Sequence, residues 1–245
     1  MIFYSATDEG RVRRINQDYL FASKKPVGKL PNLLIVADGM GGHNAGERAS
    51  SYAVEVLVET IRNSRERNPI KCLRSAIEEA NRRVLEESRS EEMYHGMGTT
   101  IVAATVIKGN IYVANVGDSR LYIIGNRMFQ VTRDHSLVEE MIRSGGLTRE
   151  EGKNHPDRHI ITRAVGVDQK VDVDFFEWKL KKDDVILLCS DGLTNMVSDE
   201  EIQQIVRNSE DLQKAGDRLV ALANENGGSD NITVLLAKMR VDEVR

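Results

Sequence analysis

Residues 33–43 read Leu-Leu-Ile-Val-Ala-Asp-Gly-Met-Gly-Gly-His. The first five are apolar and the Asp-Gly pair that follows favours a turn, which together are typical of a buried strand and its end. A second apolar run, Tyr19–Ser23, lies upstream and is preceded by Asp18. In an antiparallel hairpin, the residue before the first strand and the residue after the second lie at the same edge. The sequence therefore predicts that Asp18 and Asp38 are neighbours.

Three more apolar runs carry an acid at one end: Ile111–Val116 is followed by Asp118, Val185–Cys189 is followed by Asp191, and Ile232–Ala237 is preceded by Asp230. Any single Asp-Gly is most often only a turn. A shared core, however, would draw the ends of these strands together, so we expect five carboxylates at one edge. Clustered carboxylates repel one another unless a cation lies among them.

Helical spacing of apolar residues covers two stretches between these strands, 49–61 and 70–84, each with a charged opposite face. Further helices are predicted at Ser136–Ser144, Asp199–Asn208 and Asp211–Asn224. Strands followed by helices and then strands indicate an α+β fold with helices layered on antiparallel sheets. No linker, repeat or low-complexity tract divides residues 1–245, so we expect a single domain.

Oxygen ligands suit hard cations such as Mg²⁺ or Mn²⁺, and no His or Cys pattern of a zinc site occurs. Two such ions about 4 Å apart can activate a bridging water and brace the attacking and leaving oxygens of a displacement. Phosphate ester hydrolysis is the predicted use. Arg13 or Arg14, just ahead of Asp18, would supply the donor for the phosphate, although charge alone favours a solvated surface arginine at either position, since most arginines are exposed.

Composition excludes several alternatives. A net charge of −4 gives no attraction to nucleic acid. The opening residues lack the pattern of a signal peptide, and no apolar run reaches the length of a membrane span, so we expect a cytoplasmic protein. Cys72 and Cys189 are predicted to be buried; Glu78 and Asn195 stand where a cysteine-dependent phosphatase would need arginine.

Seven motifs in order resemble the metal-dependent protein phosphatases of the type-2C class. They are Gly10-x-x-Arg13-x-x-Asn16-Gln17-Asp18, Val36 to His43, Gly96 to Thr100, Asn115 to Arg120, Ile161 to Gly166, Leu188 to Gly192, and Ser229 to Thr233. The match spans essentially the whole chain. The resemblance implies a four-layer α-β-β-α sandwich, with two antiparallel sheets between helix pairs and a flap, at about residues 145–165, near the active site.

The resemblance also implies roles for site residues. Asp38 would bridge two Mn²⁺ or Mg²⁺ ions, with help from the Gly39 carbonyl, and Asp191 and Asp230 would hold the second ion. Asp118 with Asp191 would bind a weaker third ion, as in bacterial relatives. Arg13, rather than Arg14, would take the phosphate. Asp18 would bind metal-held water, and Asn231 would orient its neighbour.

Animal relatives carry a histidine directly after the Asp-Gly pair, where this chain has Met40; His43, as in bacterial relatives, could instead protonate the leaving group. The remaining histidines, His95, His135, His155 and His159, are interpreted as structural or surface residues.

The predicted substrates are phosphoserine and phosphothreonine in proteins, including a serine/threonine kinase that a monomeric phosphatase would oppose. Two alternatives stay open: a phosphatase of a phosphorylated anti-sigma-factor antagonist, and an inactive binding module, which the presence of all the metal-binding aspartates disfavours. An aspartyl-phosphate mechanism at Asp172 or Asp174 lacks a preceding apolar strand, so both are read as exposed strand or loop residues.

Overall fold

The computed structural model describes residues 1–42, 44–90, 92–153 and 155–239. Its strands form two sheets in which every neighbouring pair is antiparallel. The first sheet has the order β1 (Ile2–Asp8), β11 (Ile232–Lys238), β10 (Val185–Cys189), β7 (Arg120–Ile124) and β8 (Met128–Gln130). The second has the order β2 (Asp18–Ser23), β3 (Leu33–Met40), β5 (Ile101–Ile107), β6 (Asn110–Val116) and β9 (Asp174–Lys179), with the short β4 (Gly98–Thr99) also paired to β3.

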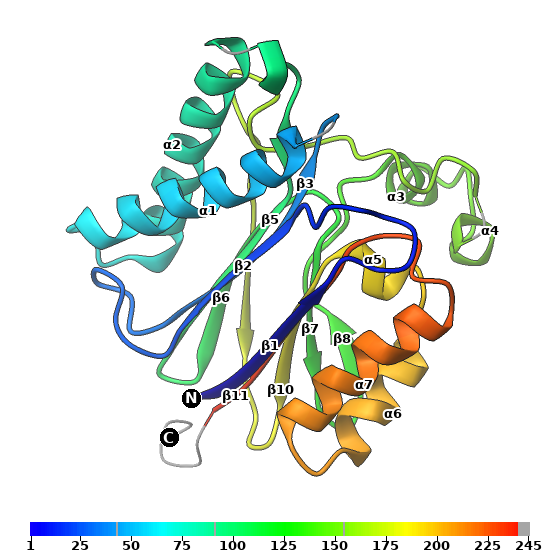
Figure 1. The fold of residues 1–245 in the computed structure, drawn as a ribbon. Helices are drawn as coiled ribbons and strands as arrows, with labels where there is room; N and C mark the ends of the chain where they lie inside the picture. Colours follow the sequence, from blue (N-terminus) through cyan, green and yellow to red (C-terminus); the bar gives the residue numbers. More distant parts are fainter. Residues whose placement is uncertain (43, 91, 154, 240–245) are drawn as a thin grey trace.

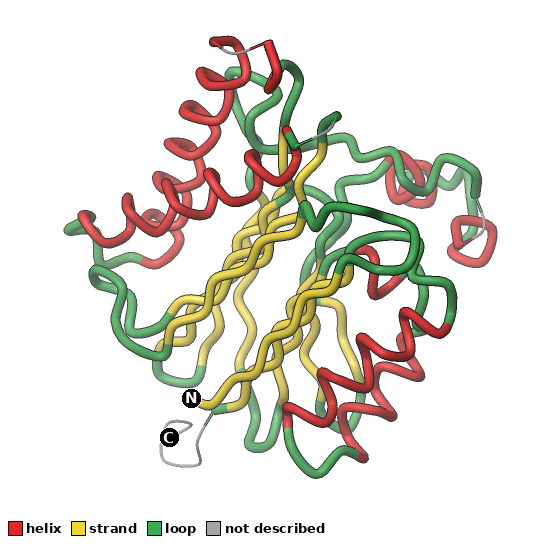
Figure 2. The backbone as a smooth tube through the Cα atoms, viewed as in Figure 1, coloured by secondary structure: helices red, strands yellow, loops and turns green. Residues whose placement is uncertain are grey.

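Helices cover the outer face of each sheet (Figures 1 and 2). Two long helices, α1 (Ala45–Asn63) and α2 (Pro69–Ser90), lie on the second sheet, and the 3₁₀ turn η1 (Glu92–Tyr94) follows them. The first sheet is covered by α6 (Asp199–Asn208) and α7 (Leu212–Glu225), with the short α5 (Asp191–Thr194) at one end. Together the layers form the four-layer α-β-β-α sandwich that the family resemblance implied.

Three buried clusters fill the three spaces between these layers. The period of two along a strand sends alternate residues to opposite faces. On β3, Leu33 and Ile35 pack under α1 and α2, whereas Leu34 and Val36 face the other sheet. The cluster under α6 and α7 includes Leu219. Strands that are buried on both faces need apolar residues at every position, which explains why their sequences are continuous apolar runs.

The predicted helices are confirmed to within a few residues. α6 has the predicted bounds and starts at a capping box in which the Ser198 hydroxyl accepts from Glu201 N–H and the Glu201 carboxylate accepts in return. α3 (Leu137–Arg143) lies between the caps Ser136 and Ser144. Within the described ranges, no helix is both long enough and apolar enough to cross a bilayer.

Several strands escape the sequence reading: β1, β4, β5, β7, β8 and β9. The view of Asp174 as an exposed residue is wrong. Asp174 begins β9, is part-buried, and lies 3.2 Å from Arg163. Apolar and charged residues are mixed along Asp174–Lys179, and this pattern hid the strand. Among the described strands, β9 pairs only with β6, at the edge of its sheet.

The segment between α3 and β9 includes α4 (Arg149–Lys153) and lies beside α5 in Figure 1. It returns to the body through Ile160, whose carbonyl accepts from Leu137 N–H, and through Thr162, whose N–H donates to the His135 carbonyl. The predicted flap of about residues 145–165 falls in this segment.

Candidate metal centre

The predicted neighbours Asp18 and Asp38 face each other directly. They are register partners at the end of the β2–β3 hairpin, which confirms the inference drawn from the two apolar runs. The N–H of Gly39 donates to the Gln17 carbonyl at 3.0 Å and extends the pairing beyond Asp38. Gly39 is needed at this point because a Cβ would lie 2.0 Å from the Gly46 carbonyl oxygen at the start of α1.

Asp191 and Asp230 come together because β10 and β11 are antiparallel. Asp191 starts α5 directly after β10, and Asp230 lies just ahead of β11. The Ser190 hydroxyl donates to Asp18 Oδ2 at 2.6 Å, and so ties the end of β10 to the other sheet. The ends of both sheets therefore meet at one place.

Asp118 enters from the turn between β6 and β7. The adjacent Gly117 has φ +101°, and a Cβ there would lie 2.5 Å from a methyl carbon of Thr100. Thr100 links this turn to β3, because its hydroxyl lies 2.7 Å from that of Ser119 and accepts from Asp38 N–H at 2.9 Å.

These carboxyl groups share a desolvated and mutually repulsive environment. Loss of hydration raises the pKa of Asp18 to about 7, helped by the charges of Asp191 and Asp230. The pKa of Asp38 lies well above its ordinary value, first because of desolvation and next because of the charge of Asp18. Desolvation followed by the charge of Asp191 likewise raises the pKa of Asp118. The pKa of Asp191 is raised by desolvation and then by Asp230.

The donor set fits hard divalent ions. The clustered side chains offer carboxylate oxygens, and Oδ1 of Asp18 and Oδ1 of Asp191 are buried with no hydrogen-bond partner in the described part of the chain. In the same described ranges, no three His, Cys, Asp or Glu side chains enclose an ion by themselves. Two of the carboxylate oxygens accept hydrogen bonds from side chains: Asn195 donates to Asp191 Oδ2, and Arg13 donates to Asp230 Oδ2, both at 2.8 Å.

Arg13 is half-exposed and reaches the cluster through this ion pair with Asp230. Its loop is anchored by the side chain of Asn231, whose amide donates to the carbonyls of Glu9 and Ile15 at 3.0 Å and accepts from Gln17 N–H at 2.9 Å. Asn231 therefore positions the arginine loop with its side chain, and orients Asp230 only through its backbone N–H.

His43 lies outside the described residues. Of the other histidines, His135 is structural, as expected: it is buried, and desolvation lowers its pKa. Its Nδ1 accepts from Gly117 N–H at 3.1 Å, and its backbone N–H donates to the Gly117 carbonyl at 3.0 Å. His135 thus fixes the backbone just before Asp118, a role that a lone histidine in the sequence did not reveal.

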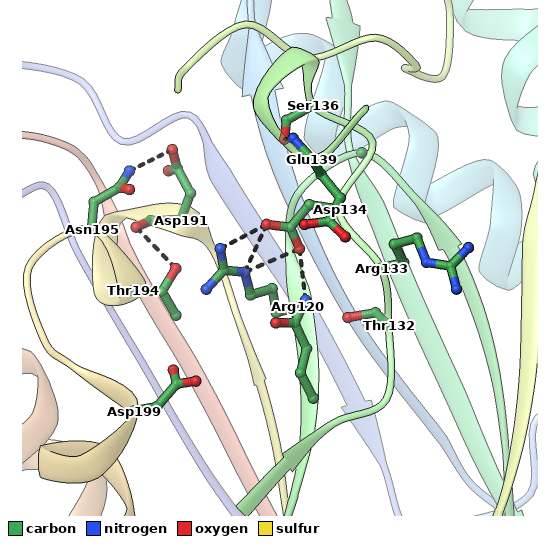
Figure 3. A network of polar contacts seen from close by, with 12 residues as sticks. Arg120, Thr132, Arg133, Asp134, Ser136, Glu139, Asp191, Thr194, Asn195 and Asp199 are labelled. Carbon is green, nitrogen blue, oxygen red and sulfur yellow. Dashed lines mark hydrogen bonds and ion pairs between the residues drawn. The ribbon is translucent and has the colours of Figure 1, made fainter. Parts of the chain in front are cut away.

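Asp134, which precedes His135, fixes the other side of the turn that carries Asp118. Its carboxylate accepts from Arg120 Nε and NH2 at 2.6–3.0 Å (Figure 3). Arg120 also donates to the Tyr122 hydroxyl at 2.9 Å. Arg120 lies two residues after Asp118 and lowers the pKa of that carboxyl, partly opposing its desolvation. Sequence reasoning also missed His159, whose charge acts on Asp191 from the flap segment.

The structure is thus a four-layer sandwich with carboxylates gathered where its two sheets end. Residues 10–237 match the family model described as Protein phosphatase 2C, and the chain belongs to that family.

Known relatives agree along nearly the full length. The chain is 42% identical over 241 residues to Serine/threonine phosphatase stp of Listeria welshimeri, covering 95% of this chain and 93% of that one. It is similar to the crystal structure of Serine/threonine phosphatase Stp1 from Staphylococcus aureus, with TM-score 0.90, 36% identity, and coverage of 97% and 94%. It is also similar to the catalytic domain of the phosphatase PstP in complex with 2 manganese ions, with TM-score 0.83, 31% identity, and 96% coverage of each chain.

Proposed function

We propose that this chain is a metal-dependent phosphatase of phosphoserine and phosphothreonine in proteins, acting as a single catalytic domain over residues 1–245. The observation that carries the proposal is the meeting of Asp18, Asp38, Asp118 and Asp191, whose pKa values are all raised. Carboxyl groups placed this way are stabilised in their charged form by divalent cations. The names of the relatives supply the substrate class.

In this proposal each acid has its own role. Asp38 and the Gly39 carbonyl would hold one ion, Asp38 would also serve a second ion together with Asp191 and Asp230, and Asp118 with Asp191 would hold a weaker third. The manganese ions bound by the PstP catalytic domain support Mn²⁺ as one suitable ion, and Mg²⁺ has the same ligand preference. When bound, such ions supply charge neutralisation and lower the pKa of a water molecule.

The protein's own groups position the substrate. Arg13 supplies a guanidinium fork for the phosphate and lies beside Asp230, so the phosphate would be drawn to the edge of the carboxylate cluster. Asp18 accepts from Ser190 with one oxygen and leaves the other, Oδ1, without a protein partner among the described residues, so it can orient water on the ions. His43 stays a candidate proton donor.

We further propose that the substrates are phosphorylated proteins, among them a serine/threonine kinase that the phosphatase opposes, and that the protein acts in the cytoplasm as a monomer.

The test is hydrolysis of a phosphothreonine peptide by the purified chain with Mn²⁺, with excess chelator, and in the variant Asp38→Asn. We expect turnover with Mn²⁺, none in chelator, and a loss of about a hundredfold or more in the variant, because one shared ligand serves two ions. Asp172→Asn is the matched control, since Asp172 is exposed and is not one of the clustered carboxylates. Full turnover in chelator, or in Asp38→Asn, would disprove the assignment.

A further inference from the structure

A second concave site lies at the opposite end of the sheets. It is a groove of about 690 Å³ formed by the β7–β8 turn, the β9–β10 turn, and the end of α6 with the loop that follows it. Val185 lines the groove at the start of β10, whereas Asp191 follows the end of β10. The chain rises about 3.3 Å per residue over the six steps from Val185 to Asp191, so the groove lies about 20 Å from the carboxylates. The proposed phosphatase reaction therefore does not use it.

An aromatic pair forms an apolar wall of this groove. The rings of Phe129 and Trp178 lie with centroids 5.4 Å apart, and Phe129 is 44% exposed. Phe129 belongs to β8 and Trp178 to β9, and each of these is an edge strand of its sheet. Ile2, 47% exposed, adds a further apolar surface. Exposed aromatic surface of this kind, in a hollow, is characteristic of recognition sites.

Cations without acidic partners among the described residues line the same groove as the aromatic pair. Arg127, Lys181 and Lys182 line the groove, are exposed, and make no ion pair with any residue that the structure describes. Arg207 donates to the Gly125 carbonyl at 2.9 Å, a neutral group that leaves its charge uncompensated.

Two of the acids that line the groove are neutralised by ion pairs: Asp183 pairs with Lys238 at 3.1 Å, and Glu210 pairs with Lys214. Asp184 and Asp211 accept from backbone N–H groups, which leave their charge uncompensated. The four cations named above outnumber these two carboxylates, so the uncompensated charge of the groove is positive.

We propose that this groove docks an acidic, extended segment of a partner protein, anchored by one large apolar side chain against Phe129 and Trp178. Carboxylates on either side of the anchor would pair with Arg127, Lys181 and Lys182. An extended segment suits the place because β8 pairs only with β7 among the described strands and so offers a free strand edge. Docking here would hold a phosphoprotein while the distant carboxylate site acts on it.

Trp178 reports on the groove directly, because it is the only tryptophan in the chain. The probe is the peptide acetyl-Glu-Asp-Glu-Phe-Glu-Asp-Glu-amide, titrated into the full chain while tryptophan emission is followed. We expect a saturable change in emission. A peptide with lysine at every acidic position should produce none, since only the acidic one complements the cations.

Charge reversal tests the assignment. Arg127→Glu with Lys182→Glu should weaken peptide binding at least tenfold, and Phe129→Ala should weaken it by a similar factor. Arg65→Glu with Arg67→Glu is the matched control, because these exposed arginines lie in the loop between α1 and α2 and should leave binding unchanged. Circular dichroism melting confirms that each variant is folded.

Three results would overturn the proposal: no emission change with the acidic peptide, equal binding of the lysine peptide, or equal weakening in the Arg65/Arg67 control. Vesicles of phosphatidylserine and phosphatidylcholine provide a fourth test. If the protein binds these vesicles through Arg127 and Lys182 and does not bind the peptide, the groove recognises a lipid surface and the proposal is wrong. These readouts are independent of phosphatase activity, so the docking proposal and the phosphatase proposal can fail separately.

Discussion

At the scale of single residues, the two arginines ahead of Asp18 separate clearly. Both are exposed, but only Arg13 reaches the carboxylate cluster, where NH2 lies 2.8 Å from Asp230 Oδ2. Arg14 has no ion pair among the described residues. The placement follows from the loop, whose backbone is held by three hydrogen bonds to Asn231. The sequence alone could not distinguish Arg13 from Arg14, because the direction in which each side chain points depends on how the loop is anchored.

Arg13→Ala should raise KM for a phosphothreonine peptide about tenfold, with a smaller fall in kcat, because a charge-assisted contact to the phosphate is lost in the ground state as well as in the transition state. Steady-state kinetics at saturating Mn²⁺ measure both constants. Arg14→Ala is the control and should behave as the wild type. An unchanged KM in Arg13→Ala would remove this arginine from phosphate binding.

At the scale of elements, close backbone contacts set how the strands and helices meet at the cluster. α5 starts at Asp191, and its second residue, Gly192, lies against the residue just before β11. A Cβ on Gly192 would be 2.0 Å from the Asn231 carbonyl oxygen. The Asp-Gly pair here is therefore more than a turn signal, since the glycine lets Asp191 and Asp230 approach.

Gly192→Ala should lower the free energy of unfolding by about 3 kcal/mol, because a backbone carbonyl cannot move aside as a side chain can. It should also weaken Mn²⁺ binding at least tenfold. Urea unfolding in chelator and calorimetric titration with Mn²⁺ measure the two effects. Gly42→Ala is the control, because nothing lies within 4 Å of a Cβ there. Equal stability and equal Mn²⁺ affinity in both variants would refute this view of the α5–β11 contact.

At the scale of the whole molecule, charge is distributed between two ends. The desolvated carboxyl groups gather where the sheets end beside α5, and cations without ion pairs among the described residues line the groove where β1 begins and β11 ends. A modest net charge of −4 conceals this separation. Stability and partner choice should therefore respond to pH and metal ions at one end, and to acidic partners at the other.

Stability in the absence of metal ions should fall as pH rises. The pKa of Asp18 is about 7 in the folded protein against an ordinary 3.8, so between these values the folded state keeps a proton that the unfolded state has lost. Loss of the Asp18 proton lowers the free energy of unfolding by up to about 4 kcal/mol. The raised pKa values of Asp38, Asp118 and Asp191 act in the same direction.

Thermal unfolding in excess chelator between pH 5 and pH 8 tests this expectation. The midpoint should fall towards pH 8, Mn²⁺ should restore it there, and Asp18→Asn should reduce the pH dependence. Asp172→Asn, at an exposed position, should leave the dependence unchanged. A chelated protein that is more stable at pH 8 than at pH 5 would contradict the shared desolvation of these carboxyl groups.

The sequence by itself determined which acids follow or precede buried strands, and the antiparallel pairing rule then placed Asp18 opposite Asp38, as the structure confirms. It also determined the main helices, because apolar periodicity and caps such as Ser198 are local properties. The strand β9 escaped it, because apolar and charged residues are mixed over Asp174–Lys179 and form no continuous apolar run.

Only the tertiary structure decided how residues distant in the chain act on each other. His135 and Asp134 hold the turn that carries Asp118, Asn231 holds the loop of Arg13, and the groove joins the edge strands of two sheets. These pairings depend on the register and packing of whole layers. Desolvation, which raises the pKa values of the acids, likewise exists only once the layers have closed.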